Sequence, residues 1–286
     1  MTPEIEAFFD PHTFTITYLV SDPPTRRAVI IDPVLDFDPK SGRTSTQSAA
    51  TVLAAARAKK LSIEWILETH AHADHLSAAA FLKEQTGAKV AIGEHIKDVQ
   101  KVFGPIFDAK DILGDGTPFD RLLKHGETLH VGGMVIEVIF TPGHTPACVS
   151  YKIGDNVFVG DTLFMPDYGT ARADFPGGDA HALYRSIQRI LALPSETILW
   201  MCHDYKAPGR DKFAWRSTVG EERAGNVHVH DGIGEDEFVA KRIARDRTLE
   251  MPVLILPSVQ VNIRAGHMPP AEADGHVYLK LPVNRL

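Results

Sequence analysis

The chain has 286 residues, of which 44% are hydrophobic, and it can therefore bury the core of one large domain or two modest ones. Its formal net charge of -7 argues against the dense basic face of a nucleic-acid surface, so we expect no nucleic-acid partner. The first residues lack a basic segment followed by an apolar stretch, and about 18 consecutive apolar residues occur nowhere, which predicts a cytoplasmic protein that binds no membrane.

The opening part of the chain is typical of antiparallel strands. Residues 13–20 alternate polar and apolar side chains, a Ser-Asp-Pro-Pro turn follows, and residues 27–33 form a second run, so together they predict a hairpin. Asp32 ends the second run, where an Asp-Pro pair is also compatible with a simple turn. Residues 36–46 are polar and contain proline and glycine, which predicts a surface loop.

Helical and strand patterns alternate in the next part of the chain, and this alternation predicts an α/β fold. The predicted elements are a helix over residues 49–60 capped by Thr46 or Ser48, a strand over 63–69, a helix over 77–86 closed by Gly87, a strand over 89–92 and a helix over 94–103. Residues 104–118 contain three glycines and two prolines, which predicts a loop that borders a functional site.

The second half of the chain repeats the hairpin pattern and then becomes helical. The predicted elements are hairpins over 127–138 and 148–159, a glycine- and proline-rich substrate loop over 165–178, a helix over 180–193 capped by Asp179, a strand over 198–202, and helices over 219–227 and 235–249. The remaining residues form a strand-poor tail with several prolines.

The stretch over residues 69–76, Thr-His-Ala-His-Ala-Asp-His-Leu, packs three imidazoles and one carboxylate into six positions after an apolar run. Neutral imidazole and carboxylate are ligands for zinc, iron and manganese, whereas a core that buried these groups without partners would be costly. Further residues of ligand type follow strand-like runs, and four strand ends can meet at one rim of a sheet. The candidate ligands are His70, His72, Asp74, His75, His144, Asp161 and His203.

Cys148 and Cys202 are the only cysteines, which excludes a disulfide framework and leaves nitrogen and oxygen to hold the metal. Cys202 directly precedes His203 on an alternating strand. We therefore expect the two side chains on opposite faces and the Cys202 thiol in the core.

The order of these motifs resembles the metallo-β-lactamase superfamily over residues 12–206. The motifs are the H-x-H-x-D-H run, Thr-Pro-Gly before His144, Gly before Asp161, and the pair His203-Asp204. The resemblance implies an αβ/βα sandwich of two mixed sheets flanked by helices, with the metal at one edge of the facing sheets. We expect residues 1–206 to form the catalytic domain and residues 207–286 to be a C-terminal extension packed on the sandwich.

Within the superfamily, the chain is more similar to the persulfide dioxygenases, also called sulfur dioxygenases, than to any other branch. The usual Gly-x-Gly-Arg-Thr-Asp-Phe motif of that family reads Gly-Thr-Ala-Arg-Ala-Asp-Phe over residues 169–175 here, and this departure falls in the substrate loop. The positions that carry the similarity are Leu163, Phe164, Gly169, Arg172, Asp174, Phe175, His203, Asp204 and Tyr205.

The dioxygenase resemblance implies one Fe(II) per chain, held by His70, His144 and Asp161. This set leaves three positions open for O2 and for the terminal sulfur of glutathione persulfide or a related persulfide, which would be oxidised to sulfite and free thiol. Arg172 and Tyr205 would bind the substrate, the arginine by bidentate pairing with a carboxylate. The residues expected to surround the metal without binding it are His72, Asp74, His75 and His203, with Asp32 beneath them as the partner of a ligand imidazole.

A glyoxalase II-like hydrolase of glutathione thioesters is the alternative, in which a hydroxide with a pKa lowered to about 7 attacks the thioester. A metal-binding sensor or scaffold is a third hypothesis, against which the intact ligand set argues. The expected partners are a small thiol persulfide and O2, and the sequence is compatible with a homodimer. In the hydrolase, one zinc would be bound by His70, His72 and His144 and another by Asp74, His75 and His203, with Asp161 as the bridge.

Overall fold

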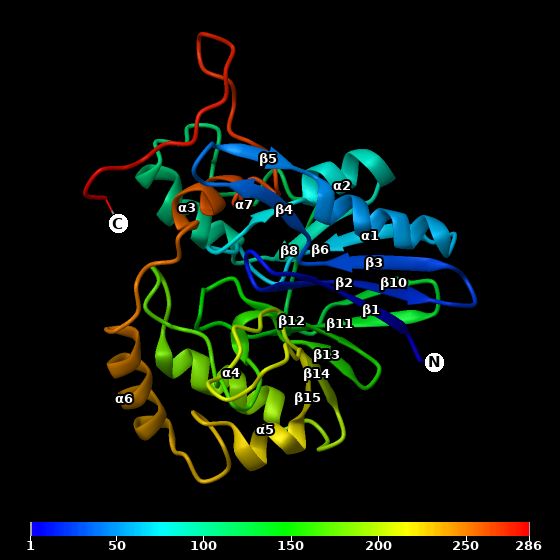
Figure 1. Ribbon diagram of the computed structural model, residues 1–286, viewed down its shortest axis with the longest axis vertical. Coiled ribbons are helices and arrows are strands. Elements are labelled where there is room, and N and C mark those ends of the chain that lie inside the picture. Colours follow the sequence, from blue (N-terminus) through cyan, green and yellow to red (C-terminus); the bar gives the residue numbers. More distant parts are fainter. Residues whose placement is uncertain (1, 286) are drawn as a thin grey trace.

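The computed structural model describes residues 2–285 and contains two six-stranded sheets that face each other. Helices cover the outer face of each sheet, so the layers run helix, sheet, sheet, helix (Figure 1). The αβ/βα sandwich that the sequence predicts is therefore confirmed.

The first sheet combines an antiparallel half with a parallel half. The predicted hairpin forms from β2 and β3, whereas β6, β8 and β9 run parallel to the strand beside them because helices or long segments connect them. The edge strand β1 pairs antiparallel with β2 and was missed by the sequence prediction. In spatial order the strands are β1 (Glu4–Asp10), β2 (Thr15–Asp22), β3 (Arg27–Ile31), β6 (Ser62–Leu67), β8 (Lys89–Gly93) and β9 (Arg121–Leu123).

The second sheet contains the two later hairpins that the sequence predicts. Only β13 and β14 run parallel to each other, because α4 lies between them in the chain. In spatial order the strands are β10 (Thr128–Val131), β11 (Met134–Phe140), β12 (Val149–Ile153), β13 (Asn156–Phe158), β14 (Ile198–Trp200) and β15 (Arg216–Thr218).

A third, small sheet corrects the prediction of a surface loop over residues 36–46. In it, β4 (Val34–Asp38) pairs with β5 (Arg43–Ser45) on one side and with β7 (Leu76–Ser77) on the other. Asp38 closes the hairpin by accepting hydrogen bonds from Lys40 and Ser41. The polar composition hid these strands because the hairpin lies on the surface, where both faces of β5 are exposed.

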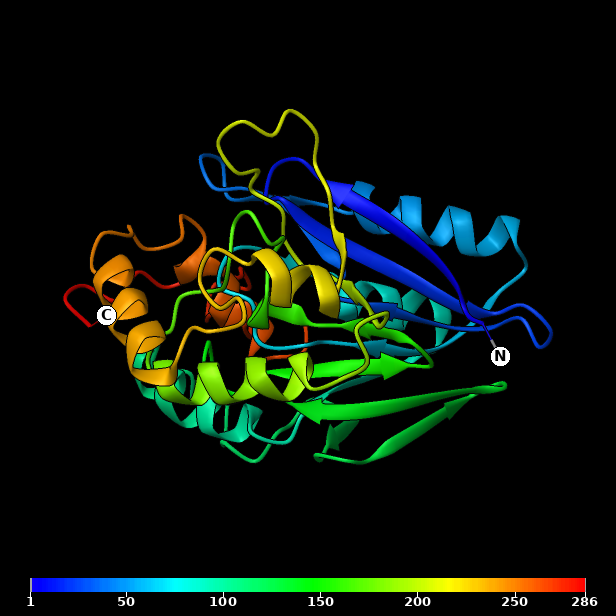
Figure 2. The ribbon, with the colours of Figure 1, turned by 90° about the horizontal axis from the view of Figure 1, so that it is seen from below.

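Within residues 2–285, four helices cover the first sheet and three cover the second, where α4 extends along the outer face (Figure 2). Asp179 caps α4 as predicted, since its side chain accepts from the amides of His181 and Ala182. Thr46 and Ser48 do not cap α1; the Ser48 hydroxyl instead donates to Asp36 on β4. The helices are α1 (Gln47–Ala58), α2 (Ala79–Thr86), α3 (Ile96–Ile106) and α7 (Ile255–Asn262) on the first sheet, and α4 (Ala180–Leu191), α5 (Val219–Gly225) and α6 (Glu235–Asp246) on the second.

Alternation along the strands builds a separate apolar layer on each side of a sheet. On β3, Val29 and Ile31 point between the two sheets, whereas Ala28 and Ile30 pack under α1, α2 and α3. Both faces of the strand are therefore buried, one between the two sheets and the other under the helices. No helix within residues 2–285 is long and apolar enough to cross a membrane.

Candidate metal centre

The seven candidate ligands lie at the ends of four strands, two sheets contributing to one rim. Residues 70–75 follow β6 of the first sheet, while three ligands follow strands of the second sheet. Those three are His144 after β11, Asp161 in the short 3-10 helix η1 (Gly160–Thr162) after β13, and His203 after β14. The structure therefore brings together the residues that the motifs single out.

Gly143 shows why the turn before His144 needs glycine. Its φ is +141°, and a Cβ there would lie 2.3 Å from the backbone nitrogen and Cα of Leu183 in α4. No side chain fits this contact, so the turn packs directly on α4 and fixes the position of His144.

His70, His144 and Asp161 form one group, in which one potential ligand atom from each residue lies within 4.8 Å of the others. The Asp161 Oδ2 atom is 3.6 Å from Nε2 of His144 and 3.9 Å from Nε2 of His70. Burial raises the pKa of Asp161 to about 6 and lowers that of His144 to about 4. Near neutral pH the imidazole is thus neutral and the carboxylate ionised, as metal ligands must be.

A second group lies on the other side of Asp161. The Nε2 atom of His203 is 3.3 Å from Oδ1 of Asp161 and 3.2 Å from Oδ2 of Asp74. The ring of His72 lies between the groups, with its centroid 4.0 Å from that of His70 and 4.1 Å from that of His75. The members of this group are His72, Asp74, His75 and His203.

The two groups fit a metal because their inward-facing atoms are buried and unpaired. Buried polar atoms are almost always hydrogen-bonded, so a convergent set without partners marks an ion site. Nitrogen and carboxylate oxygen suit iron and zinc alike. Within residues 2–285 the buried atoms that make no hydrogen bond include Nε2 of His70, His75 and His203, Nδ1 of His72, Oδ2 of Asp74 and Oδ1 of Asp161.

The outer nitrogens of three rings have fixed partners that orient them. Nδ1 of His144 donates to the backbone carbonyl of Arg172 at 2.8 Å, and the Thr15 hydroxyl lies 3.3 Å from Nδ1 of both His75 and His203. Thr15, at the start of β2, was missed by the sequence prediction because a single threonine in an alternating strand carries no ligand signal. These contacts leave the opposite ring nitrogens free to face the metal.

Asp32 lies beneath His72 and is almost fully buried. Its Oδ1 accepts from the Thr69 amide at 2.7 Å and is 3.0 Å from Nε2 of His72, and its Oδ2 accepts from the Thr69 hydroxyl at 2.8 Å. Burial opposes ionisation, but the charge of His72 and these hydrogen bonds lower the pKa of Asp32. Glu68, which sequence reasoning missed although it directly precedes the motif, is also buried, with Oε2 3.5 Å from Nε2 of His72.

Cys202 corrects the expectation that its thiol points away from His203. β14 ends at Trp200, so strand alternation does not extend to residues 202 and 203. The buried thiol donates to Oδ2 of Asp32 at 3.5 Å and therefore faces the floor of the metal centre. Burial raises the pKa of the Cys202 thiol well above its ordinary value, which keeps it protonated.

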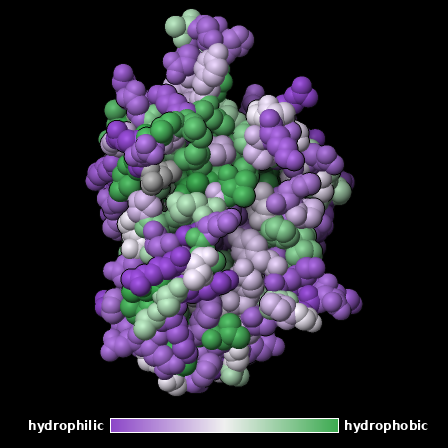
Figure 3. All heavy atoms as spheres, turned by 60° about the vertical axis from the view of Figure 1, so that its left-hand side comes forward, coloured by the Kyte–Doolittle hydropathy of each residue, from purple (hydrophilic) through white to green (hydrophobic). Residues whose placement is uncertain are grey.

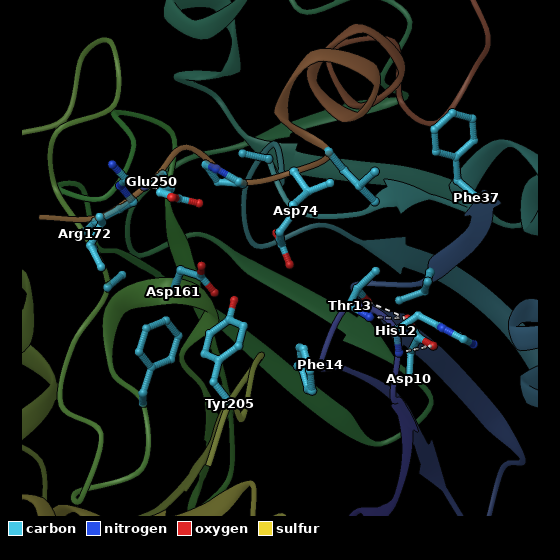
Figure 4. Close-up of a pocket in the computed structure, with 18 of the residues that line it drawn as sticks. Asp10, His12, Thr13, Phe14, Phe37, Asp74, Asp161, Arg172, Tyr205 and Glu250 are labelled. Atoms are coloured by element: carbon cyan, nitrogen blue, oxygen red, sulfur yellow. Dashed lines mark hydrogen bonds between the residues drawn. The ribbon is translucent and has the colours of Figure 1, made fainter. Parts of the chain in front are cut away.

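A cleft of about 1260 Å³ opens onto the ligands, and its wall includes Asp74, His144 and Asp161. Figure 4 shows Tyr205 beside Asp161, with its hydroxyl directed into the cleft. The Tyr205 ring is stacked on His203 with centroids 5.6 Å apart. Figure 3 shows one face of the molecule, on which hydrophobic side chains gather in the upper half of the view and hydrophilic side chains surround them.

Arg172 also lines the cleft, but its guanidinium is occupied. Nε and Nη2 donate to the two carboxylate oxygens of Asp174 at 2.6 and 2.8 Å, and Nη1 donates to the Glu250 carbonyl at 2.7 Å. A substrate carboxylate would have to displace Asp174 to pair with this guanidinium, so the predicted binding of substrate by the Arg172 side chain requires that exchange. The contact that reaches the metal centre is its backbone carbonyl, which holds His144.

Comparison with known proteins places the chain in context. The family model described as "Metallo-beta-lactamase superfamily" matches residues 13–203. A protein of Burkholderia pseudomallei (strain 1710b), named a probable metallo-hydrolase, is 53% identical over 99% of this chain and 99% of its own length. A protein of Dictyostelium discoideum named "Glyoxylase B2" is 46% identical over 99% of this chain and 98% of its own length.

More distant relatives carry another name. The protein named "Persulfide dioxygenase ETHE1, mitochondrial" from Homo sapiens is 29% identical over 93% of this chain and 90% of its own length. Among solved structures, ETHE1 from Myxococcus xanthus is 32% identical and superposes with a TM-score of 0.74 over 92% of this chain and 100% of that chain.

Proposed function

Because the chain belongs to the metallo-β-lactamase superfamily, we propose that it is an Fe(II)-dependent persulfide dioxygenase that acts on glutathione persulfide or a related small persulfide. The observation that carries this proposal is the group of His70, His144 and Asp161, two members of which form part of the cleft wall. Two imidazoles and one carboxylate are the ligand set of non-haem Fe(II) oxygenases. The similarity to ETHE1, which extends over nearly the whole of both chains, supports it.

An Fe(II) held by this group would supply the sites at which O2 and the persulfide sulfur react. The chain's own residues would prepare those sites. Arg172 holds His144 through its carbonyl, and the Thr69 hydroxyl lies 3.0 Å from Nδ1 of His70, so both rings present Nε2 to the centre. The Tyr205 hydroxyl faces the cleft beside Asp161 and is placed to donate a hydrogen bond to a bound persulfide.

Substrate recognition requires a cation for the carboxylates of glutathione. Since the fork of Arg172 is filled by Asp174, we propose that Arg245 takes this role. Arg245 extends from α6 into the lining of the cleft, where its Nη1 atom donates to the Thr248 hydroxyl at 3.5 Å and no carboxylate within residues 2–285 pairs with it. Figure 4 shows Arg172 and Glu250 on the same side of the cleft, next to the chain that continues from α6.

We expect Arg245→Ala to raise the KM for glutathione persulfide about two- to fivefold with little change in turnover, because an exposed ion pair contributes modestly and equally to ground and transition states. Steady-state kinetics measure this change. Arg247→Ala is the matched control, because Arg247 is exposed on the same helix end and lies outside the cleft lining. Equal effects of the two substitutions would remove Arg245 from the substrate site.

The test of the proposed function is oxygen uptake by the iron-loaded protein with glutathione persulfide, measured beside hydrolysis of a glutathione thioester on the same preparation. The dioxygenase reaction converts persulfide, O2 and water to thiol, sulfite and two protons, so one O2 is consumed for each sulfite. We expect this ratio, and no turnover under nitrogen. Thioester cleavage under nitrogen, with no O2 consumed on persulfide, would contradict the proposal.

A glyoxalase II-like hydrolase with two metal ions is the second candidate. Two observations favour it: the 46% identity to "Glyoxylase B2", and a second group of potential ligands beside Asp161, formed by His72, Asp74, His75 and His203. In it, Asp161 would bridge two metals, since its oxygens face His144 on one side and His203 on the other. Two metal ions per chain with full activity would support this candidate.

A further inference from the structure

The loop that carries four of the candidate ligands has an irregular backbone. Residues 70–75 lie between β6 and β7 and belong to no helix or strand. Its buried carbonyl groups therefore have no partner in a sheet ladder and must be satisfied by other means. Whatever satisfies them determines where the ligand side chains point.

The side chain of Asn262 supplies the missing partners. Its Nδ2 atom donates to the carbonyls of His72 and His75, each at 2.8 Å, and its Oδ1 accepts from the Ser77 amide at 2.8 Å. Asn262 is 4% exposed and ends α7, far outside residues 13–203 that the family model matches. The two amide hydrogens of one carboxamide thus bind two carbonyls of the loop, and its oxygen binds the adjoining strand β7.

The segment that ends α7 and follows it is itself fixed by contacts with distant parts of the chain. Arg264 forms a bidentate ion pair with Asp111, with two N–O distances of 2.7 Å. The Gln100 side chain donates to the Ile263 carbonyl at 2.9 Å. Gly266 has a φ of +83°, and a Cβ there would lie 2.9 Å from the Ala80 backbone nitrogen, so the chain packs directly on the start of α2.

We propose that Asn262 is a positioning residue for the metal centre, through which the C-terminal segment sets the geometry of the ligand loop. Asn262 touches the backbone of the loop and acts through it on the candidate ligands His72 and His75. The centre is then completed by residues that follow the catalytic sandwich in the chain. The loop carries His70 in the single-iron arrangement and His70, His72, Asp74 and His75 in the two-zinc arrangement, so its geometry bears on both.

Gln260 provides a matched control on the same helix. Its side chain also makes three hydrogen bonds to backbone, donating to the Leu256 and Lys280 carbonyls and accepting from the Lys280 amide. These bonds are remote from the ligand loop, and Gln260 is buried to 1% exposure. Asn262→Leu and Gln260→Met therefore remove equal numbers of hydrogen bonds, and only the first removes support from the loop.

The experiment titrates Co²⁺ into the metal-free full-length protein in competition with a chelator and records the visible d–d spectrum. We expect Asn262→Leu to weaken Co²⁺ binding about 10- to 100-fold, as outer partners of metal ligands do, and to alter the spectrum. Gln260→Met should lower thermal stability but leave both readouts unchanged. If Asn262→Leu does not fold, Asn262→Ser replaces the carboxamide by one hydroxyl, which can still form a hydrogen bond, and is expected to give a smaller change in the same direction.

Two results would overturn the inference. The first is wild-type affinity and spectrum in the folded Asn262 variant. The second is an equal loss of affinity in the Gln260 variant, which would reduce the role of Asn262 to general stability. Because the titration uses Co²⁺ and no substrate, its outcome is independent of whether the protein is a dioxygenase or a hydrolase.

Discussion

Asp161→Ala is expected to reduce the iron content of anaerobically reconstituted protein from about one per chain to near zero and to abolish oxygen uptake. Asp161 is the one carboxylate in the group that it forms with His70 and His144, so its loss leaves two neutral ligands there. Metal analysis after removal of free iron measures the content. Asp167→Ala is the control, because it removes a carboxylate from the cleft lining that belongs to neither ligand group.

The companion variant His203→Ala separates one metal from two. With a single iron held by His70, His144 and Asp161, His203→Ala should retain the iron. A paired centre would lose metal in both variants, since His203 lies within 3.3 Å of Asp161. Retention of iron in Asp161→Ala would contradict both arrangements.

Asp32→Ala is expected to lower the free energy of unfolding of the metal-free protein by about 3–5 kcal/mol, the usual cost of removing one partner of a buried charged pair. The carboxylate is 2% exposed and accepts from Thr69 twice, and His72 faces it at 3.0 Å. Urea denaturation measures the change. Asp32→Asn retains the shape of the side chain, and we expect it to lower the free energy of unfolding by less. A decrease below about 1 kcal/mol in Asp32→Ala would refute this account.

The same carboxylate predicts a sensitivity to acid. Because the folded state lowers the pKa of Asp32, its stabilisation is present above the ordinary carboxyl pKa of about 4 and is lost as the pH falls through the lower folded value. Stability of the wild type should therefore fall more steeply below about pH 4 than that of Asp32→Ala. Parallel stability profiles would show that Asp32 is not ionised in the folded protein.

Local patterns in the sequence predicted much of the sandwich and of the ligand set. The reason is that the candidate ligands occur in four segments, each of which follows within a few residues a run rich in β-branched or aromatic residues, so chain order places them near strand ends. The hairpin of β2 and β3 and the cap at Asp179 are local in the same sense. The order of the motifs along the chain predicted the superfamily, and the family-model match over residues 13–203 confirms that prediction.

The parts that were missed depend on contacts between distant residues. Thr15 lies 60 and 188 residues from the histidines that it contacts, and Asn262 lies 190 residues from His72. Thr15 has no neighbouring pattern that would mark it, and although residues 261–264 resemble a segment near the end of the dioxygenase family, that resemblance indicates no role for Asn262. The side chain of Arg172 could not be judged either, because its pairing with Asp174 depends on the conformation of the loop that carries both.

The ligands come from both sheets, since residues 70–75 follow β6 and the other three follow β11, β13 and β14. A bound ion would therefore act as a cross-link that ties the two halves of the sandwich at one end. Its binding free energy would add to folding stability by mass action, by about 1.4 kcal/mol for each tenfold excess of free metal over its Kd. Metal supply in the cell would then govern how long the chain survives proteolysis, as well as how much of it is active.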